Sequence, residues 1–159
     1  MKCRVCKVPF IKLRPMQIAC SPLCAIQIVK AAKEKAERKE TRRRREKLKT
    51  RAQWQKEAQQ AFNAYIRERD SGKPCVSCGR HHEGQWHAGH YLSTGARPEL
   101  RFDEANCHKQ CQPCNTHLSG NIVRYRAQLI HRIGAAELER LEGPQVQVKC
   151  TSDDLKAIR

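Results

Sequence analysis

Four closely spaced pairs of cysteines limit the folds open to this 159-residue chain more than any other feature of its sequence. The pairs in CRVC and CSPLC supply a first set of four: Cys3, Cys6, Cys20 and Cys24. The pairs in CVSC and CQPC supply a second set of four: Cys75, Cys78, Cys111 and Cys114. Two such pairs can converge as thiolates on one tetrahedral zinc ion. The sequence therefore predicts two structural zinc sites.

The composition explains why such a chain would need metal. Only 39% of its residues are hydrophobic and 5% aromatic, and small domains short of core are commonly stabilised by metal or disulfides. Basic residues from Lys2 to Arg14 interrupt each apolar run near the start. We therefore expect no signal peptide, a cytoplasmic location, and zinc rather than disulfides. No segment reaches the length of a membrane span, so no membrane partner is expected.

The charge of the chain predicts a polyanionic partner. Its 32 Lys and Arg outnumber 16 Asp and Glu, which gives a formal net charge of +16. Such a field attracts DNA through the release of condensed counterions. The excess peaks between residues 30 and 51, where twelve basic residues stand against four Glu. The candidate DNA contacts there are Arg42, Arg43, Arg44 and Arg45; a solvated basic linker is the alternative.

The order of patterns along the chain predicts four segments in a small, zinc-stabilised α+β protein. Residues 1–25 form an N-terminal zinc finger, and residues 26–70, which contain no Gly or Pro, form a long basic helix or linker. An apolar stripe from Trp54 to Ile66 is expected to pack on the following domain. Residues 71–143 form that domain and include C-terminal helices. Residues 144–159 form a C-terminal segment whose final stretch, TSDDLKAIR, starts like a capped helix.

The insert between the second set of cysteine pairs is richer than a structural loop requires. It contains the run WHAGHYL, typical of a strand, then turn residues, and then Asn106 before the second knuckle. Asn115 follows that knuckle directly. A strand, loop, strand and helix around a histidine and an asparagine resemble the ββα-metal hairpin of zinc-bearing HNH endonucleases. The resemblance implies that His90 is the general base, Asn106 the loop asparagine and Asn115 a ligand of a catalytic ion.

Those roles fit the chemistry of phosphodiester hydrolysis. Histidine titrates near neutral pH and can take a proton from water, and an amide oxygen is a suitable ligand for Mg²⁺ or Mn²⁺. HNH enzymes usually place an acidic ligand directly before the base, whereas this chain has Gly89 there. His87 and His108 are the candidate replacements.

Three basic residues flank the expected site and are candidates to hold the scissile phosphate: Arg97, Arg101 and Lys109. A generic basic surface is the alternative interpretation.

The stretch GHYLSTGARPELRFDEANCHKQCQPCNTHLSGN also resembles the NinG family of lambdoid-phage recombination proteins. That resemblance implies a metal-dependent endonuclease that cuts branched recombination intermediates, such as Holliday junctions and D-loops, in the cytoplasm of a bacterial host. It implies phage or host recombination proteins as partners. A homodimer would supply the two active sites that symmetric cutting needs.

Two other functions compete with the nuclease. One is a non-catalytic zinc protein that binds nucleic acid, which would have no need of His90. The other is a thiol redox protein, which would need reactive cysteines in place of metal-bound ones.

Overall fold

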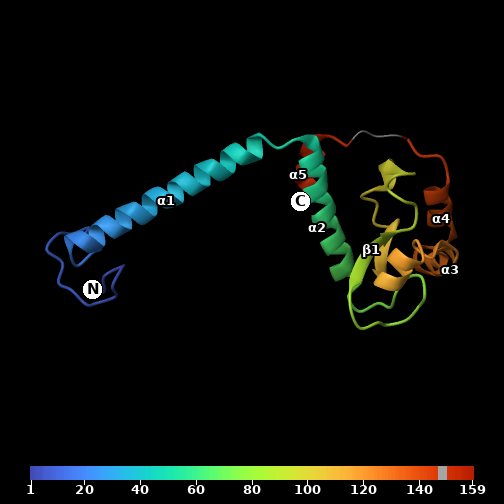
Figure 1. The fold of residues 1–159 in the computed structure, drawn as a ribbon, viewed down its shortest axis with the longest axis horizontal. Helices are drawn as coiled ribbons and strands as arrows, with labels where there is room; N and C mark the ends of the chain where they lie inside the picture. The colour runs from blue at the N-terminus through green and yellow to red at the C-terminus, as the bar shows by residue number, and fades with distance from the viewer. Residues whose placement is uncertain (147–149) are drawn as a thin grey trace. The chain divides into compact units, whose positions relative to one another are not determined.

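The computed structural model describes residues 1–146 and 150–159, and the chain separates into two compact units, Met1–Lys49 and Thr50–Arg159 (Figure 1). Helices and one two-stranded sheet make it a small α+β protein, as the sequence predicts. Residues 147–149 of the expected C-terminal segment 144–159 lie outside the described residues.

The first unit consists of the expected cysteine knuckles followed by helix α1, Pro22–Lys47. The backbone bridge between Lys2 and Pro9 closes the first knuckle. Ser21 caps α1 by accepting a hydrogen bond from the Cys24 N–H, and proline opens the helix, where its missing N–H costs nothing. No residue of α1 is buried, so its basic side chains face solvent within this unit.

The helical segment expected at residues 26–70 is interrupted. Helix α1 ends at Lys47, and α2, Arg51–Arg69, begins after Thr50. The Thr50 side chain accepts from the Gln53 N–H, and the Gln53 side chain accepts from the Thr50 N–H, which is a capping box. This start signal separates α1, which has no buried residue, from α2, which belongs to the second unit.

Helix α2 packs as the apolar stripe predicts. Trp54, Ala58, Phe62 and Ile66 are its buried residues. They recur at intervals of four, which places them on one helical face. Phe62 and Ile66 contact Cys107 and Ala88 of the sheet. Figure 1 shows α2 running beside β1, with α5 next to its N-terminal half.

The sheet is an antiparallel hairpin of β1, Trp86–His90, and β2, Cys107–Cys111. Directly paired residues share a face. One face therefore carries the pairs Trp86–Cys111, Ala88–Lys109 and His90–Cys107, and it packs on α2. The other face carries the pairs His87–Gln110 and Gly89–His108.

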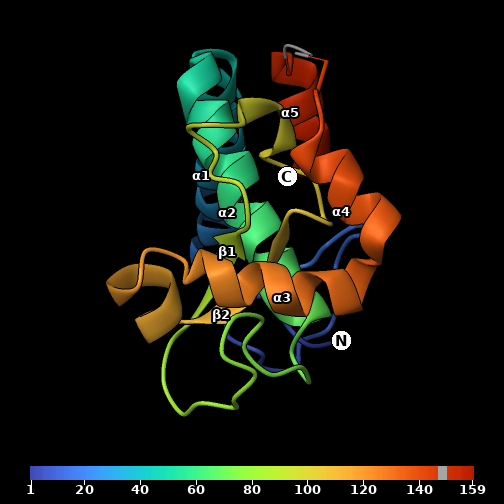
Figure 2. The same ribbon diagram turned by 90° about the vertical axis from the view of Figure 1, so that its right-hand side faces the viewer.

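The second face of the hairpin is covered by the helices that follow it. These are a short π-helix η2, Pro113–His117, then α3, Ile122–Ile133, and α4, Ala135–Glu142. Figure 2 shows α3 beside β2, with α4 continuing from it. Tyr125 and Leu129 of α3 join the main core, together with Leu138 and Leu141 of α4. Gly134, at φ 83°, adopts the left-handed backbone that ends α3.

The C-terminal helix α5, Ser152–Ile158, is anchored on the second unit. Thr151 and Asp154 form a capping box at its start. Leu155 is fully buried against Trp54 and Ala58 of α2. A short 3-10 turn η1, Pro98–Leu100, lies in the connection between the two strands.

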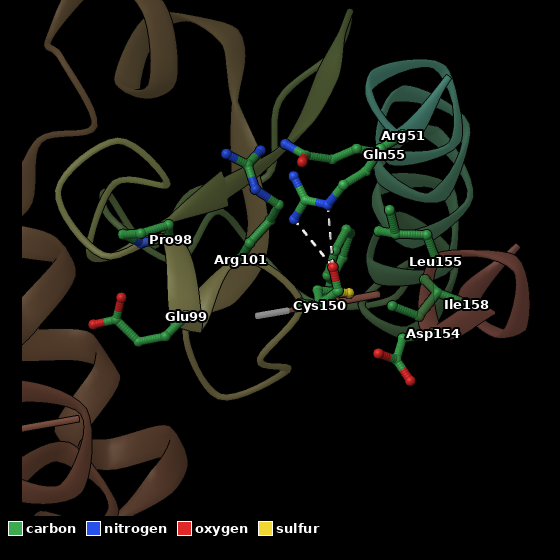
Figure 3. A pocket seen from close by; sticks show the side chains of 10 residues that line it. Arg51, Gln55, Pro98, Glu99, Arg101, Cys150, Asp154, Leu155 and Ile158 are labelled. Atoms are coloured by element: carbon green, nitrogen blue, oxygen red, sulfur yellow. Dashed lines mark hydrogen bonds between the residues drawn. The ribbon is translucent and has the colours of Figure 1, made fainter. Parts of the chain in front are cut away.

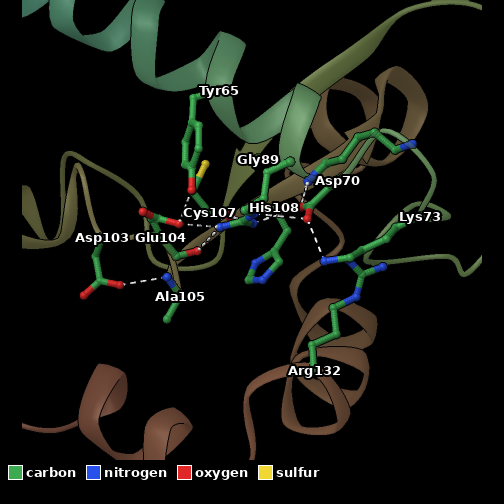
Figure 4. Close-up of polar contacts among 12 residues, drawn as sticks. Tyr65, Asp70, Lys73, Gly89, Asp103, Glu104, Ala105, Cys107, His108 and Arg132 are labelled. Atoms are coloured by element: carbon green, nitrogen blue, oxygen red, sulfur yellow. Dashed lines mark hydrogen bonds and ion pairs between the residues drawn. The ribbon is translucent and has the colours of Figure 1, made fainter. Parts of the chain in front are cut away.

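A buried ion-pair network ties the end of α2 to β2 (Figure 4). Asp70, fully buried, accepts hydrogen bonds from Arg69, Lys73 and the Lys109 N–H. Burial would raise the pKa of Asp70, but these three donors outweigh it and hold the pKa well below its usual range. Arg69 also donates to the Cys107 backbone oxygen. The network therefore fixes the position of β2 relative to α2.

Candidate metal centre and active site

Both predicted sets of four cysteines come together. Within each set the sulfur atoms lie within 4.8 Å of one another. In the first set, Cys3 is buried, and the N–H groups of Cys20 and Cys6 help lower the pKa of its thiol to about 6. The chain therefore brings together two cysteine tetrads, each of which could hold zinc.

The second tetrad is built at the base of the hairpin. Cys75, Cys111 and Cys114 are buried, and the Gly79 N–H donates to the Cys75 oxygen to close the first knuckle. Burial would raise the pKa of Cys75, but N–H groups of Cys78, Cys111 and Ser77 point at its sulfur and lower the pKa overall. Such N–H donors stabilise the thiolate form that binds metal.

His82 contacts the second tetrad. Its Nε2 lies 3.2 Å from the Cys78 sulfur, and its ring meets Trp86 edge-on. The i to i+4 spacing from Cys78 was the available signal.

His87 and Asn115 meet on the second face of the hairpin. The Asn115 Nδ2 atom donates to His87 Nδ1 over 2.9 Å. Asn115 lies in η2, directly after Cys114, so the cysteine tetrad fixes its position. In this arrangement His87 Nδ1 orients the amide of Asn115 and turns Oδ1 away from the imidazole.

His90 ends β1 and belongs to the opposite face of the hairpin. Its ring stacks on Phe62 of α2, and its Nε2 lies 2.9 Å from the Arg101 oxygen. Burial lowers the pKa of His90, an effect that the hydrogen bond to Arg101 only partly opposes. A half-buried, neutral imidazole at the end of a strand is a suitable general base.

Asn106 is a clamp for the loop that follows β1. Its Oδ1 accepts from the Leu92 N–H, while its Nδ2 donates to the oxygens of Leu92 and Leu100. The side chain is fully buried. Because Leu100 precedes Arg101, this clamp also positions the carbonyl that holds His90.

His108 lies in the core. It is 5% exposed, and its Nδ1 lies 3.3 Å from the Tyr125 hydroxyl, which donates to the Gly89 oxygen. Burial, followed by the charge of Arg69, lowers the pKa of His108 to about 4. One of the two ring nitrogens of His108 is therefore engaged in a structural hydrogen bond.

The second face also contains an acceptor that lacks a partner. Gln110 is fully buried, and its Nε2 donates to Ser77 Oγ and to the Gly120 oxygen, whereas its Oε1 has no hydrogen-bond partner among the described residues. An unsatisfied buried acceptor costs about 1–3 kcal/mol. A Cβ on Gly89 would lie 2.1 Å from this Oε1 and 3.1 Å from Asn115 Oδ1. Position 89 must therefore be glycine while Gln110 occupies this space.

The structure corrects the expectation for Lys109 as a DNA contact. Lys109 is 4% exposed, its Nζ donates to the Ser71 oxygen, and it lies over the Trp86 ring. Its position on the α2-facing side of β2 explains the burial.

Arg97 and Arg101 are likewise engaged within the fold. Arg97 donates to the carbonyls of Glu142 and Gly143 at the end of α4, and Arg101 donates to Gln59 and Thr94. Arg101 also lines a pocket with Arg51, Glu99 and Asp154 (Figure 3). The two carboxylates balance the charges of the two arginines, so the pocket offers a phosphate no net positive charge.

Arg42, Arg43, Arg44 and Arg45 are all exposed on α1. Arg44 pairs with Glu40 one turn earlier. These four side chains remain accessible to a phosphate backbone within their own unit.

The fold and site define a small α+β protein whose two four-cysteine clusters could hold zinc. The family described as "Bacteriophage Lambda NinG protein" matches residues 1–159, and the chain belongs to that family. The protein ninG of Salmonella phage P22 is 54% identical over 112 residues, which cover 70% of this chain and 55% of that protein. The ninG protein of Enterobacteria phage H19B is 44% identical over 176 residues, which cover 99% of this chain and 88% of that protein.

The protein ninG of Escherichia phage lambda is 52% identical over 112 residues, again 70% of this chain and 55% of that protein. The match thus spans about half the length of the phage P22 and lambda relatives. No solved structure matches the chain. Within the described residues, none of the helices combines the length and apolarity needed to cross a membrane.

Proposed function

We propose that this chain is a metal-dependent endonuclease of the HNH type that hydrolyses DNA phosphodiester bonds in branched recombination intermediates, such as Holliday junctions and D-loops. The observation that carries the proposal is the position of His90 at the end of β1, with one ring nitrogen held by the Arg101 carbonyl. A purely structural zinc hairpin has no use for a half-buried imidazole kept neutral in this way.

The residues on the other face of the hairpin suit a divalent ion. The amide oxygen of Asn115 and the orphaned Oε1 of Gln110 both lie near Gly89. Oxygen donors with few protein ligands are typical of Mg²⁺ and Mn²⁺ sites, where water fills the other positions. When bound, such an ion would neutralise the negative charge that develops on the leaving oxygen.

His90 ends β1, and Asn115 contacts His87 on the second face of the hairpin; the proposal requires both side chains to reach one phosphate at this end of the strand. In an in-line displacement, the attacking water and the leaving oxygen stand on opposite sides of phosphorus. His90 would take the proton of the attacking water, and an ion held by Asn115 would stabilise the leaving oxygen. Asn106 positions the base through Leu100 and Arg101.

The remaining parts of the chain support binding to DNA in the bacterial cytoplasm. The exposed arginines of α1 supply phosphate contacts that do not depend on sequence. Preference for branched DNA, a homodimer and contacts with phage or host recombination proteins complete the proposal. They rest on the resemblance seen in the sequence and on the two active sites that symmetric cutting needs, and not on any contact within this chain.

The test uses the zinc-loaded full chain with four-way junction, D-loop, single-stranded and duplex DNA, in Mg²⁺ or Mn²⁺. His90→Ala should lower cleavage by about 10²- to 10⁴-fold, the usual contribution of a general base, with junction binding nearly unchanged. His131→Ala, an exposed histidine on α3, is the matched control. Unchanged cleavage by His90→Ala would remove the mechanism, and equal cutting of all four DNAs would remove the preference for branches.

The alternative function, a non-catalytic zinc protein that binds nucleic acid, is favoured by the exposure of the α1 arginines from Arg42 to Arg45. It predicts tight junction binding with no cleavage in either metal.

A further inference from the structure

We propose that the buried side-chain oxygen of Gln110 is a ligand of the catalytic ion and takes the place of the acid that HNH enzymes carry at the position of Gly89. This inference rests on the proposed nuclease function, because it assigns a ligand to the ion that the function requires.

The orientation of the Gln110 amide is fixed by its neighbours. Nε2 lies 2.5 Å from the backbone oxygen of Gly120, an atom that can only accept. Ser77 Oγ, 2.6 Å from the same Nε2, donates its own proton to that Gly120 oxygen. Exchanging the amide nitrogen and oxygen would place two acceptors against each other, so Oε1 must point away, toward Gly89.

The space that Oε1 faces is the one that a side chain at position 89 would fill. A Cβ built on Gly89 would lie 2.1 Å from Oε1 and 3.1 Å from Asn115 Oδ1. An acidic side chain at position 89 and the Gln110 amide therefore cannot coexist in this arrangement. With glycine at position 89 and glutamine at position 110, the ligand oxygen comes from β2. An acidic residue at position 89 would supply it from β1.

Asn115 is oriented for the same point. Its Nδ2 donates to His87 Nδ1, which directs Oδ1 toward the Gly89 side. The side-chain oxygens of Gln110 and Asn115 thus converge near Gly89. Within the described part of the chain, Gln110 Oε1 accepts no hydrogen bond. A cation satisfies converging oxygens of this kind. In this arrangement the role of His87 is to orient Asn115.

The donor chemistry distinguishes this arrangement from one with His87 as ligand. Two neutral amide oxygens form a hard donor set, which suits Mg²⁺ and Mn²⁺ and gives no advantage to Ni²⁺ or Zn²⁺. An imidazole ligand would instead favour the later transition metals.

The experiment measures Mn²⁺ binding to the zinc-loaded full chain by the loss of the free-Mn²⁺ electron paramagnetic resonance signal, with Mg²⁺ as competitor. Gln110→Met keeps the side-chain length and removes the oxygen, so Mn²⁺ should bind at least about tenfold more weakly. Gln112→Met, two residues along and without a side-chain cap bond, is the matched control and should bind as the parent does. If Gln110→Met binds Mn²⁺ with an affinity within twofold of that of the parent, the inference is overturned. The same result is expected if a buried water, and not an ion, contacts Oε1.

A second variant decides the matter if Gln110→Met loses zinc or unfolds. Gly89→Asp combined with Gln110→Ala returns the oxygen to β1 in the vacated space, and it should bind Mn²⁺ more tightly than Gln110→Ala alone. Failure of that rescue counts against the inference. If the parent chain binds Mn²⁺ and cuts junctions and the Gln110 variants behave as the parent does, only this inference fails. If the parent chain neither binds Mn²⁺ nor cuts junctions, the proposed function fails.

Discussion

The Nε2 atom of His90 lies 2.9 Å from the backbone oxygen of Arg101, so this nitrogen carries the proton and Nδ1 is left as the basic atom. Burial lowers the pKa of the ring below its ordinary value of about 6.5. A general base works in its neutral form. Cleavage should therefore rise with pH through a point below about 6.5 and be level at neutral pH. A rate profile of the zinc-loaded chain under single-turnover conditions measures this, and an acid limb centred above 6.5 would contradict it.

Asn106 should affect cleavage through the fold and not through the ion. Asn106→Ala leaves buried groups of Leu92 and Leu100 without partners, which should lower the free energy of unfolding of the second unit by about 3 kcal/mol. Mn²⁺ affinity in the folded variant should stay near that of the parent. Thermal unfolding and Mn²⁺ titration separate the two effects; a tenfold loss of affinity at unchanged stability would instead make Asn106 a ligand.

The two cysteine tetrads should release zinc independently, because each lies within its own unit. The parent should bind about two zinc ions, and Cys6→Ser or Cys111→Ser about one each. Cys111→Ser should also abolish the cooperative unfolding of the second unit, since Cys111 is buried at the base of the hairpin. Metal analysis and calorimetry test both statements. Freely titrating thiols in the parent would favour the redox alternative.

Asp70 should be the most sensitive charged residue of the second unit. Asp70→Asn leaves Arg69 and Lys73 without their buried partner and should cost about 3 kcal/mol or more. Asp153→Asn, whose side chain is 89% exposed, is the matched control and should change stability by less than about 0.5 kcal/mol.

The difference in the free energy of unfolding between the parent and Asp70→Asn should change with pH in one direction. The pKa of Asp70 is lowered in the folded state, so its stabilisation is present above the unfolded pKa of about 3.9 and declines as the pH falls toward the folded value. The difference between the parent and Asp70→Asn in denaturant unfolding should therefore shrink below about pH 4. A difference that grows on acidification would contradict this account.

Whether a site residue could be predicted from the sequence depends on whether its role is set by local spacing or by the tertiary fold. Tetrahedral zinc imposes short, recognisable spacings, so both tetrads could be found from the chain alone. The strand at Trp86–His90 follows in the same way from the local run WHAGHYL. These features depend on residues close together in the sequence.

The features that could not be predicted from the sequence depend on which face of the hairpin a residue occupies. Lys109 is buried and Gln110 is orphaned because β2 is covered on both sides, a property of the tertiary fold. The alternation of His108 and Gln110 was a usable signal, since both fall on the face of Gly89. The helix break at Thr50 was also legible as a Thr-x-x-Gln capping box.

The basic helix should contribute to DNA affinity in proportion to the phosphates it contacts. Consecutive helical residues are about 100° apart, so Arg42 to Arg45 cannot all face one duplex, whereas Arg42 and Arg45 share a side. Arg42→Gln with Arg45→Gln should flatten the plot of log affinity against log salt by about 1.8, or about 0.9 for each lost contact. Cleavage of bound junction should be unchanged, because the site residues lie in the other unit.

Arg67→Gln with Arg124→Gln removes the same charge from exposed positions of the second unit and serves as the control for that measurement. If DNA binding responds only to net charge, both double variants should weaken it equally and give the same salt slope. A loss confined to the α1 variant would identify this helix as a phosphate-contacting surface. Equal slopes for the parent and the α1 variant would make α1 the solvated linker, because a surface that neutralises no phosphate releases no counterions.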